Sequence, residues 1–144
     1  MPKLLKKKIG LVACCGEEIA EGTVTRLATR CVIERLRPDE TVTICLPLFL
    51  AGGEGERAFA RFHPTVTIDG CEKRCAARGT EQFSSKPAAS IVVTELSNAP
   101  CTLGTARRLN HSGAQAVKTV SEIIAKQVDL LLGKSPGDSE KEAR

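Results

Sequence analysis

Cysteine is the residue type in this chain with the widest chemistry, and it occurs at seven positions. Thiolates bind zinc and iron–sulfur clusters, attack electrophiles and form disulfides. An odd number of cysteines without a secretory signal argues against a framework of paired disulfides. We therefore expect reduced thiols in a cytoplasmic protein. The positions are Cys14, Cys15, Cys31, Cys45, Cys71, Cys75 and Cys101.

The elements that position these thiols follow from hydrophobic periodicity. Short β-branched runs alternate with longer amphipathic stretches, and this alternation is typical of right-handed βαβ units. The chain is thus predicted to form an α/β fold, a three-layer α/β/α sandwich with a mostly parallel four-stranded sheet. Strands are expected at 8–14, 40–46, 64–69 and 89–96, helices at 23–36, 56–62, 72–83 and 113–132, and a loop at 47–55.

Length and composition fit one domain. The chain has 144 residues, of which 42% are hydrophobic and 26% charged, and this size buries a core without disulfides. Only 3% of the residues are aromatic, so the core is expected to be aliphatic. We expect the domain to span residues 1–133 and the polar segment 134–144 to be a disordered tail.

The predicted topology brings several cysteines to one edge of the sheet. Cys14 ends the first strand, Cys45 ends the second, Cys71 follows the third by one glycine, and Cys75 lies four residues later. Functional sites in such sheets lie at the carboxyl ends of the strands. Neighbouring strands are about 5 Å apart and zinc–sulfur bonds are about 2.3 Å long, so the thiols of Cys14, Cys45, Cys71 and Cys75 can converge on one zinc ion.

Other interpretations of the cysteines stay open. Cys15 can replace Cys14, because neighbouring strand residues point to opposite faces. An iron–sulfur cluster, or no cofactor at all, fits the same thiols. A thiol-based redox or sulfur-transfer enzyme would use Cys71 or Cys14 as its nucleophile, so the sequence does not decide whether the protein is an enzyme. Cys31 falls on the apolar face of a helix and is expected to be a core residue.

The Asp69-Gly70-Cys71 tripeptide has a physical interpretation of its own. It places a carboxylate at a strand end, a flexible residue at a turn, and a thiol at the expected start of a helix. We expect Asp69 to accept hydrogen bonds from backbone amides of the turn. His63 lies at the opposite edge of the sheet, and His111 precedes the last helix, where a capping role is expected.

Several segments together resemble the DGC-domain family, proteins described as zinc-binding and named for their Asp-Gly-Cys motif. The segments are 67–76 (TIDGCEKRCA), 13–16 (ACCG), 43–46 (TICL) and 92–96 (VVTEL), and the resemblance spans about residues 8–96. It implies that Cys14, Cys45, Cys71 and Cys75 are the zinc ligands. Ala13, Cys15 and Pro47 depart from the family pattern. The family supplies no established reaction.

One short motif suggests different chemistry. Cys101 and Arg107 have the Cys-x5-Arg spacing of tyrosine-phosphatase loops, in which a thiolate attacks phosphorus while the arginine and backbone amides hold the phosphate. The segment lacks the usual flanking residues and begins five residues after the expected strand end. A phosphatase is therefore the least favoured function.

Charge and hydropathy exclude two classes of partner. The net charge of +4 comes partly from lysines near the N-terminus, and four phenylalanines are the only aromatic residues. Without a basic face or stacking platforms, nucleic-acid binding is not expected. The apolar run at 9–15 is too short for a membrane span, so no membrane partner is expected. The sequence leaves the oligomeric state and any other partner unknown.

Overall fold

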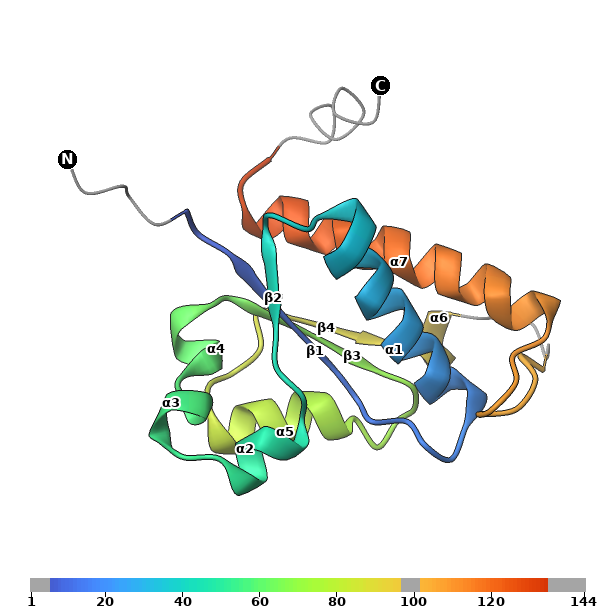
Figure 1. Ribbon diagram of the computed structural model, residues 1–144, viewed down its shortest axis with the longest axis horizontal. Helices are drawn as coiled ribbons and strands as arrows, with labels where there is room; N and C mark the ends of the chain where they lie inside the picture. Colours follow the sequence, from blue (N-terminus) through green and yellow to red (C-terminus); the bar gives the residue numbers. More distant parts are fainter. Residues whose placement is uncertain (1–5, 97–101, 135–144) are drawn as a thin grey trace.

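The computed structural model describes residues 6–96 and 102–134. Its centre is a sheet of four parallel strands in the order β2-β1-β3-β4 (Figure 1). In the register of the sheet, Leu11 pairs with Thr43 and with Val66, and Ile68 pairs with Ile91. The predicted α/β class is therefore confirmed. The strands are β1 (Ile9–Ala13), β2 (Thr41–Thr43), β3 (Thr65–Asp69) and β4 (Ala89–Val92).

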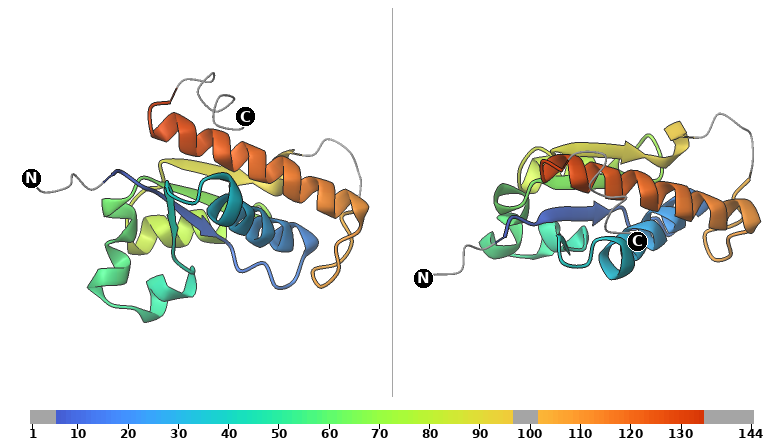
Figure 2. Two further views of the ribbon diagram at one scale, coloured as in Figure 1. Left: turned by 45° about the horizontal axis from the view of Figure 1, so that its top comes forward. Right: turned by 90° about the horizontal axis from the view of Figure 1, so that it is seen from above.

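Helices cover both faces of the sheet, which gives three layers (Figure 2). On one face lie α1 (Ala20–Cys31), its π-helical continuation η1 (Val32–Leu36) and the long helix α7 (His111–Leu131). On the other face lie α2 (Pro47–Ala51), α3 (Glu54–Arg57), α4 (Phe59–Phe62) and α5 (Cys75–Phe83). A single helical turn, α6 (Val93–Leu96), follows β4 directly.

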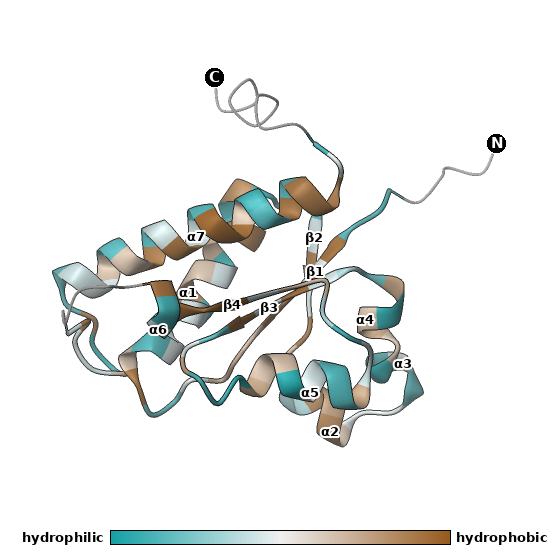
Figure 3. Cartoon of the chain, turned by 180° about the vertical axis from the view of Figure 1, so that it is seen from behind, coloured by the Kyte–Doolittle hydropathy of each residue, from teal (hydrophilic) through white to brown (hydrophobic). Residues whose placement is uncertain are grey.

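Each face of the sheet has its own core. The larger core is aliphatic and joins the strands to α1 and α7 through residues such as Leu11, Val24, Ile68 and Ile124. The smaller one contains Val12, Cys14, Phe49 and Ala76. Figure 3 shows mainly hydrophobic residues along the strands, and hydrophobic and hydrophilic residues by turns along α7. An α/β sandwich of this kind covers its strands on both sides, and the central strand β3 is buried along its whole length.

Some predicted boundaries are wrong, and each has a local cause. The expected loop at 47–55 contains helices, because Pro47 is favourable in the first turn of a helix. The strand expected at 89–96 ends at Val92, since the chain turns into α6. The helix expected from residue 72 begins at Cys75. The predicted tail lies almost entirely outside the described residues, and within those residues no helix is both long and apolar enough to cross a membrane.

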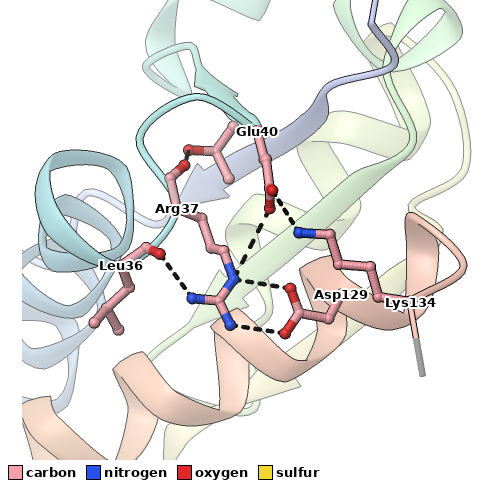
Figure 4. A network of polar contacts seen from close by, with 6 residues as sticks. Leu36, Arg37, Glu40, Asp129 and Lys134 are labelled. Carbon is pink, nitrogen blue, oxygen red and sulfur yellow. Dashed lines mark hydrogen bonds and ion pairs between the residues drawn. The ribbon is translucent and has the colours of Figure 1, made fainter. Parts of the chain in front are cut away.

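A polar network that the sequence did not predict joins the end of η1 to the end of α7 (Figure 4). The Arg37 guanidinium donates to both carboxylate oxygens of Asp129, with Nε–Oδ1 at 2.8 Å and Nη2–Oδ2 at 2.7 Å. Glu40 lies 3.9 Å from Arg37 and pairs with Lys134 on its other side. Because Arg37 and Asp129 are 92 positions apart, this two-point contact fixes the end of η1 against α7 within one layer of the fold.

Replacing Asp129 with alanine is expected to lower the free energy of unfolding by about 2–3 kcal/mol, because the largely buried guanidinium of Arg37 loses its main partner. The side chains of Arg37 and Asp129 are only 18% and 10% exposed. Urea unfolding followed by circular dichroism measures the change. The matched control is Arg30→Ala, which breaks an ion pair whose side chains are 71% and 54% exposed and should cost less than about 0.5 kcal/mol. Equal losses in both variants would contradict this role of the network.

Candidate functional site

A cavity of about 360 Å³ lies at the carboxyl ends of β1 and β3. Strand order reverses between these two strands, because the chain runs from β1 outward to β2 and from β3 outward to β4. Ligands of open α/β sheets bind at such a reversal. We call this cavity the switch-point cavity. The thiol-bearing residues that line it are Cys14, Cys15, Cys71 and Cys75.

Three glycines bring the cavity walls together. Gly16 has φ of +55°, a left-handed conformation that glycine adopts without strain. A Cβ added to Gly22, in the first turn of α1, would lie 2.2 Å from Gly16 Cα, and one added to Gly70 would lie 2.8 Å from Gly22 N. Backbone therefore packs directly on backbone at this point. The contact holds the loop after Cys14, the start of α1 and the turn before Cys71 in one place.

Cys14 is the buried thiol of the site, with 8% of its surface exposed. Its Sγ lies 3.4 Å from Thr25 Oγ1. Burial raises the pKa of Cys14 above its ordinary value of 9.0, and the charges of Asp69 and Cys75 raise that pKa further. Hydrogen bonds from Thr25 and from the Gly70 backbone oppose the increase without cancelling it. The thiol is therefore protonated near neutral pH until a cation or a reaction removes the proton.

Asp69 organises the next segment. It is 1% exposed, and its carboxylate accepts hydrogen bonds from Ala76 N at 2.7 Å and Ala77 N at 3.1 Å. These donors are in the first turn of α5, whose N-cap residue Arg74 provides no side-chain cap. Burial raises the pKa of Asp69, while the two backbone donors and the charge of Arg74 lower it to a lesser extent. Asp69 thus binds backbone amides as predicted, although the amides belong to the helix.

The helix start decides where the two thiols of the Asp-Gly-Cys segment lie. Cys71 is half-buried and belongs to a turn closed by a bond from Arg74 N to Cys71 O of 3.1 Å. Arg74 has φ of 52°, so helical geometry begins only at Cys75, which is exposed. The expectation that Cys71 begins the helix is wrong, and Cys75 occupies that position. The cause is Asp69, which caps the helix from the strand end.

Cys45 occupies a different position from the other three expected ligands. It follows the end of β2 by two residues, is exposed, and lines a second cavity of about 500 Å³ together with Cys14 and Cys15. The second cavity adjoins the first, since Cys14 and Cys15 line both. The structure therefore places three expected ligands in the switch-point cavity and the fourth in its neighbour. Within residues 6–96 and 102–134, no three Cys, His, Asp or Glu side chains are already arranged to hold a metal ion.

The remaining candidates lie away from this site or outside the described structure. Cys31 is half-buried on α1. His63 precedes β3 at the amino end of the sheet and packs against Phe59, with ring centroids 5.2 Å apart. His111 is the first residue of α7, whose cap is Asn110. Cys101 lies outside the described residues, so the phosphatase loop stays a prediction.

The functional residues that sequence reasoning missed are Gly16 and Gly22. Their role is a backbone contact between two segments, and the sequence alone does not show which segments meet. The only signal in the sequence is that both residues are glycine, one of them inside the predicted region of a helix start, at what the structure shows to be the third position of α1. Thr25 was missed as well, because its contact with Cys14 depends on the rotation of α1 against β1.

Comparison with known proteins agrees with the segments singled out in the sequence. The family model of the DGC domain matches residues 10–108. The match begins at the second residue of β1, includes the other three strands and the cavity cysteines, and extends past α6 into the loop that contains Arg107. No curated protein and no solved structure matches the chain.

Proposed function

The chain belongs to the DGC-domain family, and from that membership we propose that it is a small zinc-binding protein with one ion held by Cys14, Cys45, Cys71 and Cys75. The observation that carries this proposal is the switch-point cavity, in which Cys14, Cys71 and Cys75 share one lining. Two segments far apart in sequence deliver these thiols to one point of the sheet. Structural zinc sites use four thiolates in this way.

The donor set fits zinc in its chemistry. Thiolates are the soft ligands that zinc prefers, and Zn²⁺ accepts tetrahedral coordination without strain. The described side chains are not yet arranged for a metal, so binding would have to draw the Cys45 thiol toward Cys14 from the adjoining cavity. Metal binding would then order the segment after β2 as well as the site itself. A bound zinc ion would supply the positive charge that keeps the thiols deprotonated. If one coordination position were left open, the ion would also act as a Lewis acid toward a substrate.

A second function fits the same residues. The charge of Cys75 acts on the pKa of Cys14, and both side chains line one cavity, so the two thiols are neighbours. Neighbouring thiols of which one is exposed and one buried support a redox or sulfur-transfer function, in which Cys75, rather than the expected Cys71 or Cys14, would be the attacking group and Cys14 the resolving one. The two functions differ in whether the purified protein carries metal.

Elemental analysis and the absorption spectrum of anaerobically purified protein test the proposal. We expect one zinc per chain, no visible absorption, and loss of the metal in Cys71→Ser. The matched control is Cys31→Ser, a half-buried thiol outside both cavities, which should keep its zinc. Metal-free protein whose thiols cycle between reduced and oxidised forms would support the second function, and visible charge-transfer bands would indicate iron.

The pH dependence of zinc affinity is expected to identify Cys14 as a ligand. Because the pKa of Cys14 is raised above 9.0, zinc must displace its proton throughout the neutral range. This displacement makes the affinity rise about tenfold per pH unit for that thiol alone. Competition with a chromophoric chelator between pH 6 and 8 should therefore give a plot of log affinity against pH whose slope is lower by about one in Cys14→Ser.

The control for this titration is Cys15→Ser, because Cys15 is the neighbouring thiol and the alternative ligand. Its slope is expected to equal that of the wild type. If the slope falls by about one in Cys15→Ser and stays unchanged in Cys14→Ser, then Cys15 is the zinc ligand and the assignment of Cys14 is wrong.

A further inference from the structure

Arg74 has a backbone conformation that its residue type does not favour. Its φ of 52° and ψ of 48° are left-handed, and among the described residues it is the only one other than glycine with a positive φ. In this region the Cβ atom lies too close to a carbonyl oxygen, so glycine is the usual occupant. An arginine at this position therefore needs contacts that hold it there.

Contacts from two directions hold Arg74. On the backbone, Arg74 N donates to Cys71 O at 3.1 Å, and Arg74 O accepts from Arg78 N at 2.9 Å. On the side chain, Nη2 donates to Ser90 Oγ at 2.8 Å. Ser90 belongs to β4, an outer strand of the sheet, and pairs with Thr67 of β3. The side chain of Arg74 thus ties the turn before α5 to β4.

The conformation of residue 74 decides which partners the first amides of α5 have. If this residue were right-handed, the helix could continue backwards through residues 72 and 73, whose carbonyl oxygens would then accept from Ala76 N and Ala77 N. In the structure those two amides donate to the Asp69 carboxylate instead. The left-handed conformation of Arg74 therefore leaves them free for the carboxylate at the end of β3.

The same residue lies between two of the proposed zinc ligands. Cys71 precedes the turn, and Cys75 is the first residue of α5. Both cysteines line the switch-point cavity, and Arg74 lines it with them. Because Arg74 separates the turn from the helix, its conformation fixes the direction in which one thiol lies from the other.

We propose that Arg74 is a positioning residue of this site, whose left-handed backbone and bond to Ser90 fix Cys71 relative to Cys75 before a metal ion binds. For its metal readout this inference rests on the proposed zinc function. Ligands that are fixed in advance do not have to be ordered when the ion binds, so they hold it longer. Loss of the tie to β4 should therefore appear as faster release of zinc.

Urea unfolding of the full chain as purified tests the backbone part of this proposal. Arg74→Gly and Arg74→Ala both remove the side chain, and they differ in their preference for the left-handed region. We expect Arg74→Gly to unfold at a higher urea concentration than Arg74→Ala, with or without bound metal. A right-handed helical residue would give the reverse order, because alanine is then the better residue, and that order would overturn the proposal.

Zinc release tests the positioning part, measured as the rate at which a chromophoric chelator takes the ion from the loaded protein. Ser90→Ala removes only the tie and should release zinc about threefold faster than the wild type. Arg74→Gly also gives the turn the freedom of glycine and should release it about tenfold faster, although its urea midpoint is no lower. The matched control is Lys73→Ala, which removes a neighbouring positive charge from the same cavity lining and should leave the rate unchanged.

Three outcomes separate position from charge and from the metal function itself. Equal acceleration in Lys73→Ala and Arg74→Gly would mean that the site needs positive charge and not a fixed turn, and it would overturn the proposal. Unchanged release in Ser90→Ala would overturn it as well. A wild-type protein without zinc would refute the metal function, and the order of the two urea midpoints would still decide whether residue 74 holds the left-handed turn.

Discussion

Replacing Gly22 with alanine is expected to lower the free energy of unfolding by about 3 kcal/mol and to abolish zinc binding. The added methyl group would lie 2.2 Å from Gly16 Cα and 2.7 Å from Gly16 O. Both are backbone atoms that cannot rotate away. The loop after Cys14 must then separate from α1, and the thiols that line the switch-point cavity separate with it.

This substitution sets two physical effects against each other. Gly22 lies in α1, where helix propensity alone would make alanine more stable by about 1 kcal/mol. The matched control is Gly55→Ala in α3, because a Cβ at Gly55 meets nothing within 4 Å. We expect Gly55→Ala to be neutral or slightly stabilising. Urea unfolding and zinc content measure both variants, and a Gly22→Ala protein as stable and as zinc-rich as the wild type would refute the role of the glycine contact.

Removing the carboxylate of Asp69 is expected to have the second largest effect. In Asp69→Ala the N–H groups of Ala76 and Ala77, both buried, lose their acceptors. Each unmet donor costs about 1–3 kcal/mol, so the free energy of unfolding should fall by about 3–4 kcal/mol. The start of α5 would fray, and Cys75 would lose its fixed position beside Cys14.

The conservative variant Asp69→Asn distinguishes capping from a bulk effect of the substitution. Its amide oxygen can keep the 2.7 Å bond from Ala76 N, while its NH₂ group faces Ala77 N. We expect about half the loss of Asp69→Ala, measured by urea unfolding, together with partial retention of zinc. Equal losses in the two variants would show that the two helix amides are not what Asp69 stabilises.

The sheet and its cysteines were predictable because local patterns specify them. The β-branched runs around Leu11, Val42, Val66 and Ile91 predicted all four strands, and their alternation with helices predicted a parallel sheet between two helical layers. The alternation of elements then placed Cys14 and Cys71 at carboxyl ends. Strand ends were less certain, as β2 shows, because an outer strand has only one neighbour to extend its pairing.

The contacts that complete the site and join α1 to α7 were not predictable, because each depends on how the chain folds between the two residues that meet. From the sequence alone Gly22 is only a residue that weakens a helix, and its close contact with the backbone of Gly16 is visible only in the structure. The start of α5 at Cys75 depends on the carboxylate of Asp69, which binds the backbone of Ala76 seven residues later. The pairing of Arg37 with Asp129 spans 92 positions. In each case the deciding interaction is tertiary, and local propensity carries no trace of it.

The central claim is that four thiolates from two adjoining cavities hold one zinc ion, and X-ray absorption at the zinc edge tests it most directly. The wild type is predicted to show four sulfur neighbours at about 2.3 Å, and Cys45→Ser three sulfurs with one lighter atom. That variant is informative because Cys45 starts outside the switch-point cavity. A wild-type zinc bound mainly by nitrogen or oxygen, or a sulfur count unchanged in Cys45→Ser, would contradict the claim.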